Sequence, residues 1–570
     1  MKPSKKQIPL ITLVLLALGI VFASLILFAP GILESTETDN ISDYDLSIDV
    51  AYSSKDLDPS YDKNSATVLY LADGASYVEG SGASVNGDVI TITDEGTYIA
   101  RGSLSGGQIV ISAGESDKVQ LVLDDVAISC SDNPAIYVAQ ADKVFITLSE
   151  GSVNTLEDGS EYVATIDGIE AKATIYASSD LTLNGQGTLI VTGNYLHAIS
   201  SEDDLVITGG KYVLTAVGDG LHGKNSVKIY DGTITINAGD EGIQSDQTDD
   251  EEKGFISIDG GSITIASTGN GIEAITVLRI AGGDINITAG DGSGTSAKGL
   301  KADELVLIIG GTITLNCEDD GIHSNIDVTI DGGTLSIASG DDGIYTDENL
   351  VINGGSVTIT QSYEGLEGST ITISSGQIDI TSTDDGMNTD GWDLPQLTIN
   401  GGVISVFSSS GDGVDSNGDL TINGGKLYVE ANDSGNSAID VGDNSGGGSC
   451  VINGGLVVAV GSSSMAEGFD ASSEQPSIMY NFDTSAQSGT PVSLTNASGK
   501  IILTYTPSLS YNSVIISMPD LIIGSTYTLT IGTTVETITL DETAGSYGSV
   551  SSGFDRNSSV GEPEKMIGIV

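Results

Sequence analysis

The chain has 570 residues, among them 75 glycines and 11 prolines, and only 5% of its residues are aromatic. Hydrophobic residues make up 39% and recur at alternating positions, which excludes a disordered chain. The 20 basic and 79 acidic residues give a net charge of −59, which excludes nucleic-acid binding through phosphate neutralisation. The acids are expected to keep the surface soluble and, where they recur at fixed positions, to hold cations.

The first predicted element is a membrane anchor. Residues 1–7 are basic and expected in the cytoplasm, and residues 8–33 hold an apolar stretch long enough to span a bilayer as an uncleaved signal anchor. A cleaved signal peptide, which would make the protein secreted, is the alternative. Residues 34–65 are polar and acidic and are predicted to form a stalk on the extracellular face.

A repeat of about 22 residues runs through residues 66–474. Each unit carries a Gly-Gly turn before an apolar strand, as at Gly332-Gly333, and an acidic turn before one aliphatic residue, as at Asp319-Asp320-Gly321-Ile322. Strand segments such as Thr312-Ile313-Thr314-Leu315 are rich in β-branched residues, which favour strands over helices. Three short strands per unit predict an all-β chain folded as a right-handed parallel β-helix.

The repeat stops near residue 475. Segments such as Ile501-Ile502-Leu503-Thr504 and Val514-Ile515-Ile516 predict antiparallel strands, so residues 475–548 are expected to form a β-rich cap on the open end of the β-helix. Residues 549–570 are rich in Ser and Gly and are expected to form a flexible tail.

Stacking of the coils turns the acidic turns into a column of carboxylates on one edge. Such a density of hard oxygen ligands suits Ca²⁺, which takes six to eight oxygens, better than Mg²⁺. The alternative is that each Asp only bonds its own backbone in a tight turn, which explains one Asp per turn but not two. The predicted calcium ligands are Asp240, Glu241, Asp319, Asp320, Asp341, Asp342, Glu364, Glu367, Asp384 and Asp385.

Two lysines interrupt this acidic column. Lys298 and Lys301 either compensate the charges of Glu273 and Asp320 on adjacent coils, or one of them acts as a general base with a lowered pKa. His222 and His323 also fall in the column, several coils apart, so they are not expected to share a metal ion. No Ser-His-Asp arrangement is apparent from the sequence.

The chain resembles the carbohydrate-binding β-helix family of cell-surface proteins from about residue 45 to 530. The resemblance implies a parallel β-helix, calcium binding, affinity for plant-type polysaccharides such as cellulose or polygalacturonate, and a distant relation to calcium-dependent pectate lyases. The segments that carry it are Gly96-Thr97-Tyr98, Val119-Gln120-Leu121-Val122-Leu123, Ala135-Ile136-Tyr137, Asp142-Lys143-Val144, Lys298-Gly299-Leu300-Lys301-Ala302-Asp303 and Tyr363-Glu364-Gly365-Leu366-Glu367-Gly368.

Those lyases use an Asp-Asp-Gly-Leu-Asp turn for calcium and a lysine as base. Two of the turns here end in His323 and Tyr345 instead of an acid, although a later turn keeps the final acid as Asp415. Lys301 also comes before the double-Asp turns, whereas the lysine of those lyases follows them. The first hypothesis is therefore a membrane-anchored, calcium-binding adhesion protein for acidic or plant-type polysaccharide, with no obligate protein partner. A pectate lyase with Lys301 as base, and a surface rod that binds nothing, are the alternatives.

Sugar contacts are expected on the same edge. Aromatic rings stack on sugar rings, while amide, imidazole and ammonium groups bond sugar hydroxyls and carboxylates. The predicted carbohydrate-binding residues are Lys298, His323, Tyr345, Tyr363, Asn388 and Trp392.

Overall fold

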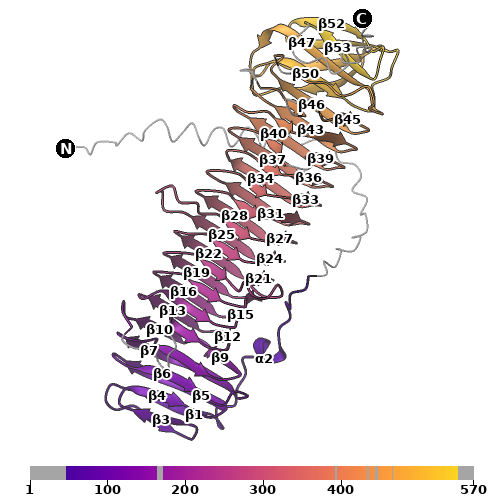
Figure 1. Ribbon diagram of the computed structural model, residues 1–570. Coiled ribbons are helices and arrows are strands. Elements are labelled where there is room, and N and C mark those ends of the chain that lie inside the picture. The colour runs from indigo at the N-terminus through magenta and orange to yellow at the C-terminus, as the bar shows by residue number, and fades with distance from the viewer. Residues whose placement is uncertain are drawn as a thin grey trace, which may run out of the picture. The chain divides into compact units, whose positions relative to one another are not determined.

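The computed structural model is a right-handed parallel β-helix, as the repeat predicts (Figure 1). It describes residues 46–162, 171–391, 395–432, 436–442, 447–464 and 466–549. The expected anchor at residues 8–33 lies outside these ranges. Within them, no helix is long and apolar enough to cross a bilayer.

Each coil contributes three short strands, and each strand pairs in parallel with its equivalent in the next coil. A complete coil consists of β17 (Leu221–Gly223), β18 (Ser226–Ile229) and β19 (Thr233–Ala238). Pairs such as Leu221 with Ile243 and His323 with Tyr345 confirm the 22-residue step. The coil of three strands is therefore confirmed as well.

The equivalent strands form three ladders. Ladder 1 is a 16-stranded sheet from β3 (Ala83–Asn86) to β44 (Ile439–Val441). Ladder 2 runs from β9 (Lys143–Leu148) to β45 (Cys450–Ile452), and ladder 3 from β10 (Val153–Asp158) to β46 (Leu456–Gly461). The central strands of ladder 1 are β20 (Ile243–Ser245), β23 (Ile272–Ala274), β26 (Leu300–Ala302), β29 (Ile322–Ser324), β32 (Ile344–Thr346), β35 (Leu366–Gly368), β38 (Met387–Thr389) and β41 (Val414–Ser416).

The core fills the inside of the coils. Aliphatic side chains that follow the acidic turns, such as Ile322 and Ile344, are fully buried and stack on one another. The turn glycine is required by close packing, because a Cβ atom on Gly321 would lie 2.6 Å from the carbonyl oxygen of Gly343. The Gly-Gly turns have another reason, since Gly333 has a φ of 90°, which L side chains rarely adopt.

Both ends of the β-helix depart from the regular coil. The first coils use the longer strands β1 (Thr67–Leu71), β5 (Gly96–Leu104) and β7 (Lys118–Cys130). At the other end, β46 pairs antiparallel with β50 (Tyr511–Ser517). The remaining C-terminal strands are β47 (Ser477–Ala486), β48 (Val492–Asn496), β49 (Ile501–Tyr505), β51 (Thr526–Ile531), β52 (Thr534–Thr539) and β53 (Ala544–Gly548).

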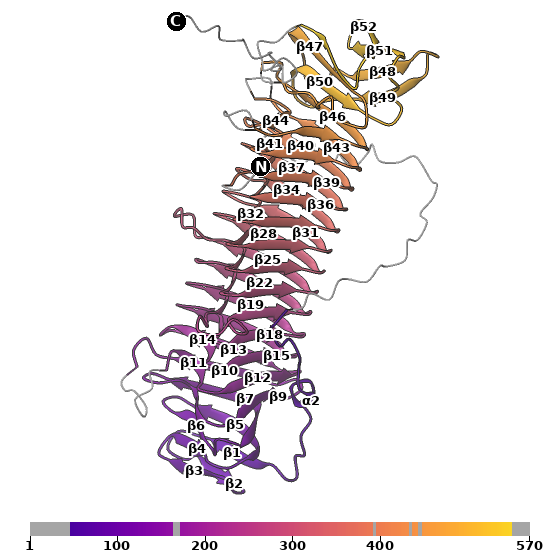
Figure 2. The ribbon, with the colours of Figure 1, turned by 45° about the vertical axis from the view of Figure 1, so that its right-hand side comes forward.

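Residues 47–61, which we call the strap, pack against the outer face of ladder 2. Tyr52 donates a hydrogen bond to the Asp259 carboxylate at 2.9 Å. Asp56 lies in the short helix α2 (Ser54–Leu57) and accepts a hydrogen bond from Thr182 at 2.6 Å, with the Lys143 ammonium 2.9 Å away. Both views place α2 beside β9 and β12 (Asp180–Gly185) (Figures 1 and 2).

Candidate functional site

The predicted column of acids exists on ladder 1, at the turn that leads into each strand. The residue before the turn glycine points outward, and one of its carboxylate oxygens accepts a hydrogen bond from the backbone of the next coil. The N–H of Asp342 donates to Asp320 at 3.1 Å, and the N–H of Glu364 donates to Asp342 at 3.2 Å. At Asp320 and Asp342 the carboxylate thus bonds the next coil, whereas the alternative interpretation from the sequence was a bond to the backbone of its own turn. Each such carboxylate keeps a second oxygen for another partner.

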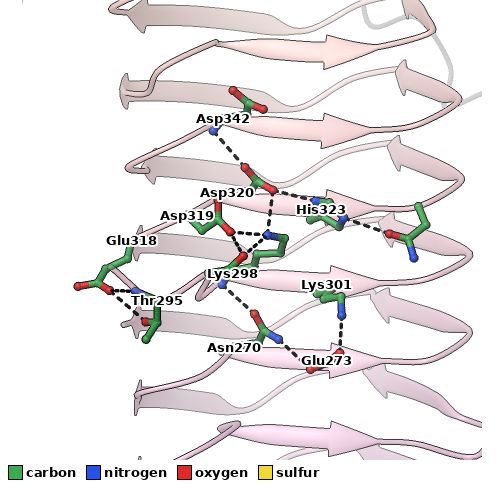
Figure 3. Close-up of polar contacts among 12 residues, drawn as sticks. Asn270, Glu273, Thr295, Lys298, Lys301, Glu318, Asp319, Asp320, His323 and Asp342 are labelled. Atoms are coloured by element: carbon green, nitrogen blue, oxygen red, sulfur yellow. Dashed lines mark hydrogen bonds and ion pairs between the residues drawn. The ribbon is translucent and has the colours of Figure 1, made fainter. Parts of the chain in front are cut away.

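Lys298 neutralises the first double-Asp turn. Its ammonium lies 2.5 Å from Asp319 and 3.3 Å from Asp320, and all three side chains are largely buried (Figure 3). Burial disfavours the charged forms, but the ion pairs outweigh it: they raise the pKa of Lys298 and lower the pKa of Asp319. Asp341 completes this group, with carboxylate oxygens of all three acids within 4.8 Å of one another.

His323 adds a further partner to the same turn. Its Nδ1 atom lies 2.7 Å from Asp320, and its ring stacks on Tyr345 with the ring centroids 4.9 Å apart. The Tyr345 hydroxyl donates to Asp347 at 2.7 Å. The structure thus brings together three predicted site residues, Lys298, His323 and Tyr345, around the Asp319-Asp320 turn.

Lys301 is held in an ion pair. Its ammonium lies 2.6 Å from the Glu273 carboxylate, and Asn270 donates to the other oxygen of Glu273 at 2.7 Å (Figure 3). A general base must be free to reach the substrate, whereas the Lys301 amine is engaged by a carboxylate of the neighbouring coil. The geometry agrees with charge compensation, the first of the two interpretations of the lysine pair.

One coil further, the acids have no such partner. Carboxylate oxygens of Asp342, Glu364 and Glu367 lie within 4.8 Å of one another, and among the described residues no Lys, Arg or His lies within salt-bridge distance of them. Burial raises the pKa of all three. Repulsion by Glu367 raises the pKa of Asp342 and Glu364 further, whereas hydrogen bonds with those two residues oppose the rise at Glu367. We call these residues the unpaired triad. Asn388 donates to Glu364 at 3.0 Å and so supports the triad from the next coil.

The acidic column continues beyond the triad. Burial and neighbouring carboxylates raise the pKa of Asp385 to about 6, of Asp412 to about 7 and of Asp415 to about 8. Asp412 and Asp415 extend the site past the predicted ligands, although the repeat spacing could have identified them. Asp384 has a different partner, because its carboxylate accepts a hydrogen bond from the hydroxyl of the exposed Tyr363. This bond raises the pKa of Tyr363 to about 12.

The predicted pair Asp240 and Glu241 lies in a separate group with Asp219. His197 Nδ1 lies 3.0 Å from Asp219, so this group also has a basic side chain beside it. A further group, Asp180, Asp203 and Asp204, is on ladder 2 and was not predicted. Asp180 and Asp204 begin equivalent strands of adjacent coils and Asp203 precedes Asp204, whereas the alignment of the turns into ladder 1 does not include these positions.

A Ser-His-Asp arrangement is present, contrary to the expectation from the sequence. Ser200 Oγ lies 3.1 Å from His222 Nδ1, and His222 Nε2 lies 3.3 Å from Asp246. The sequence signal was the 22-residue spacing of Ser200 and His222, which makes them neighbours on adjacent strands. Ser200 is only 1% exposed, so its hydroxyl is not accessible to a polymeric substrate. Trp392, the remaining predicted sugar contact, lies outside the described residues.

Comparison with known proteins identifies the family of the chain. A family model described as carbohydrate-binding domain-containing protein matches residues 86–343 and 341–479. A carbohydrate-binding domain-containing protein of Acetivibrio thermocellus is 33% identical over 153 residues, which are 26% of this chain and 53% of that protein. The chain thus spans about half the length of this curated relative.

A solved structure, described as the gadolinium derivative of a polysaccharide lyase-like protein from C. thermocellum, is 31% identical. The match covers 43% of this chain and 96% of that one, with a TM-score of 0.41. Because the family model matches well over half of the sequence, the chain belongs to the family of carbohydrate-binding domain-containing proteins.

Proposed function

We propose that this protein binds acidic polysaccharide at the cell surface through calcium ions held on the outer edge of ladder 1. The observation that carries the proposal is the unpaired triad. Three carboxylates that repel one another, with no basic residue beside them, are stable in their charged form only when a cation neutralises them.

The donor set of the triad fits calcium. Its ligands are all carboxylate oxygens, which a hard cation prefers. Calcium–oxygen distances of about 2.3–2.6 Å allow two ligands of one ion to be as much as about 5 Å apart. Oxygens that lie within 4.8 Å of one another can therefore contact the same ion. The incomplete set of three acids leaves coordination positions for water or for a ligand carboxylate.

A calcium ion would also reconcile the charge of the protein with that of the ligand. The chain carries a net charge of −59, so an acidic sugar polymer is repelled unless cations lie between the two sets of carboxylates. Bridging by calcium gives affinity for uronate polymers such as polygalacturonate. Neutral cellulose is the weaker candidate, because among the described residues Tyr363 is the large exposed ring on this edge, and one ring makes no extended aromatic platform.

The N-terminal segment completes the proposal. Residues 8–33 would anchor the protein in the cell membrane, or release it if they are cleaved, and the β-helix would face outward. We favour binding over lyase activity because Lys301 is ion-paired with Glu273.

The test is binding of the purified chain without residues 1–46 to immobilised polygalacturonate, with calcium and then with excess EDTA. Retention in calcium and elution by EDTA are expected. Retention that EDTA does not change would contradict the role of calcium, and no retention at all would favour the structural rod. The same samples are followed by ultraviolet absorbance, since the appearance of unsaturated sugar would favour the lyase.

A further inference from the structure

A second surface of the molecule has the opposite character to the acidic edge. Where the strap crosses the first coils, a hollow of about 300 Å³ opens between the strap and the strands β5, β7 and β9. Pockets of about 300–1,000 Å³ are typical of small-ligand sites. The residues that line it are Lys55, Ser60, Tyr61, Gly96, Thr97, Lys118, Gln120 and Phe145.

The hollow is cationic although the chain is strongly acidic. Lys55 and Lys118 line it, and none of its described lining residues is an acid. The Lys55 ammonium donates to the Ser60 carbonyl at 2.9 Å and so has no charged partner at that contact. Lys118 lies 3.5 Å from Asp142, and both side chains are about half exposed, so water weakens this pair. Lys55 and Lys118 are therefore the charged residues that line the hollow, with Asp58 beside the first and Asp142 beside the second.

The other lining groups match a sugar. Phe145 is 2% exposed and lies at the base of the hollow with Gln120, while Tyr61 is partly exposed on the strap side. The partly exposed ring of Tyr61 can stack on the apolar face of a sugar. The Gln120 amide is already bonded to Pro59, Thr147 and Thr97, so it holds the base of the hollow in place. An ammonium group binds a sugar carboxylate through a charge-assisted hydrogen bond.

The strap holds its side of the hollow in place. Asp56, next to Lys55, is fixed by the Lys143 ammonium and by Thr182, and the Pro59 carbonyl accepts a hydrogen bond from Gln120 at 3.3 Å. A capping box between Ser53 and Asp56 fixes the short helix itself. Lys55 and Tyr61 are therefore pre-positioned, which lowers the entropy that binding must overcome.

We propose that this hollow is a binding site for the uronate units of acidic polysaccharide, in which the lysines contact the sugar carboxylate directly and without calcium. The proposal rests on the proposed function for its substrate class but concerns a different surface. The family model begins at residue 86, so the strap residues of the site lie outside the part that matches. A chain of uronates would thus bind at two places, through calcium on ladder 1 and through lysine beside ladder 2.

The test is calorimetric titration of the chain without residues 1–46 with trigalacturonate, in EDTA and at low salt. Wild-type protein is expected to bind, and the double variant Lys55→Ala/Lys118→Ala to bind at least about tenfold more weakly, as loss of two charge-assisted contacts predicts. Lys211→Ala is the matched control: it also removes an exposed lysine, but one that lines a different hollow. Circular dichroism shows that the variants are folded.

Three results would overturn the proposal: no binding of trigalacturonate in EDTA, equal binding by the double variant, or equally strong competition by inorganic phosphate, which would indicate an unspecific anion site. Uncharged cellotriose is expected to bind more weakly than trigalacturonate. The two proposals fail separately. If calcium-dependent retention is absent but trigalacturonate binds in EDTA, only the proposed site on ladder 1 is contradicted. If retention depends on calcium but trigalacturonate does not bind in EDTA, only the proposed site in the hollow is contradicted.

Discussion

Two neighbouring groups of acids on ladder 1 differ in one respect that decides their chemistry. Asp319 and Asp320 share the Lys298 ammonium, whereas Asp342 and the two glutamates of the unpaired triad have no basic neighbour among the described residues. Asp320 and Asp342 hold the same repeat position and accept the same bond between coils. Asp319 and Asp341 stand one residue earlier in the turn, and Glu367 follows the buried aliphatic residue. Under the proposal of calcium at the triad, the Lys298 ammonium would take the place of that ion in the first group.

The largest effect is expected from removing that lysine. Lys298→Met removes the ammonium that Asp319 and Asp320 share, and Asp320 then keeps only His323 as a basic partner. Breaking a buried ion pair costs about 3–5 kcal/mol. Calcium is then expected to restore part of the stability, because the first group comes to resemble the unpaired triad. Chemical denaturation with calcium and with EDTA measures both effects. If calcium stabilises the variant no more than the wild type, the interpretation that calcium can replace the Lys298 ammonium at this turn is wrong.

Glu367→Gln tests the other group. Loss of one of three charged ligands is expected to weaken calcium binding by about 10- to 100-fold, since ligand charge sets the affinity of such sites. Calorimetric titration of chelator-treated protein with calcium measures the change. Asp341→Asn, in the group that contains Lys298, is the matched control and should change the affinity much less. Equal losses in the two variants would contradict the distinction between the groups.

The pH dependence of the calcium-free protein gives a smaller effect. Asp412 and Asp415 have pKa values of about 7 and about 8 in the folded state, above the usual value of 3.8. The folded state thus binds more protons than the unfolded state between about pH 4 and pH 8, and stability falls as pH rises through this window. Thermal melts in EDTA at several pH values should show the fall. Calcium should diminish it, and stability that rises with pH would contradict the assignment.

The smallest effect is expected from the exposed rings. Tyr363→Ala should weaken polysaccharide binding a few-fold, as loss of one stacking contact of about 1 kcal/mol predicts. Tyr345→Ala should change it less, because that ring already stacks on His323 beside the lysine-paired group. Affinity electrophoresis in polygalacturonate gels compares the two variants. A larger loss of affinity for Tyr345→Ala would indicate that the sugar binds beside the group that contains Lys298.

The fold follows from local features of the sequence, and the site only in part. The Gly-Gly turns and buried residues such as Ile322 recur at one step, so stacking follows from the repeat. The division of the acids into a group with a basic partner and a group without one does not follow from the repeat. It depends on which carboxylate the long Lys298 side chain reaches. His222 illustrates the same limit: its partner Asp246 comes from another coil at another repeat position. Contacts within one repeat position are predictable from spacing, whereas those between positions require the coordinates.

The antiparallel pairing of β46 with β50 has a consequence for the state of assembly. A stack of parallel strands ends in unpaired backbone groups that can accept a strand from another molecule. Because β50 pairs with the last strand of ladder 3, it blocks the addition of another strand at that edge. Truncation after residue 474 should therefore convert a discrete particle into one that polymerises end to end, which light scattering would detect as a concentration-dependent increase in mass.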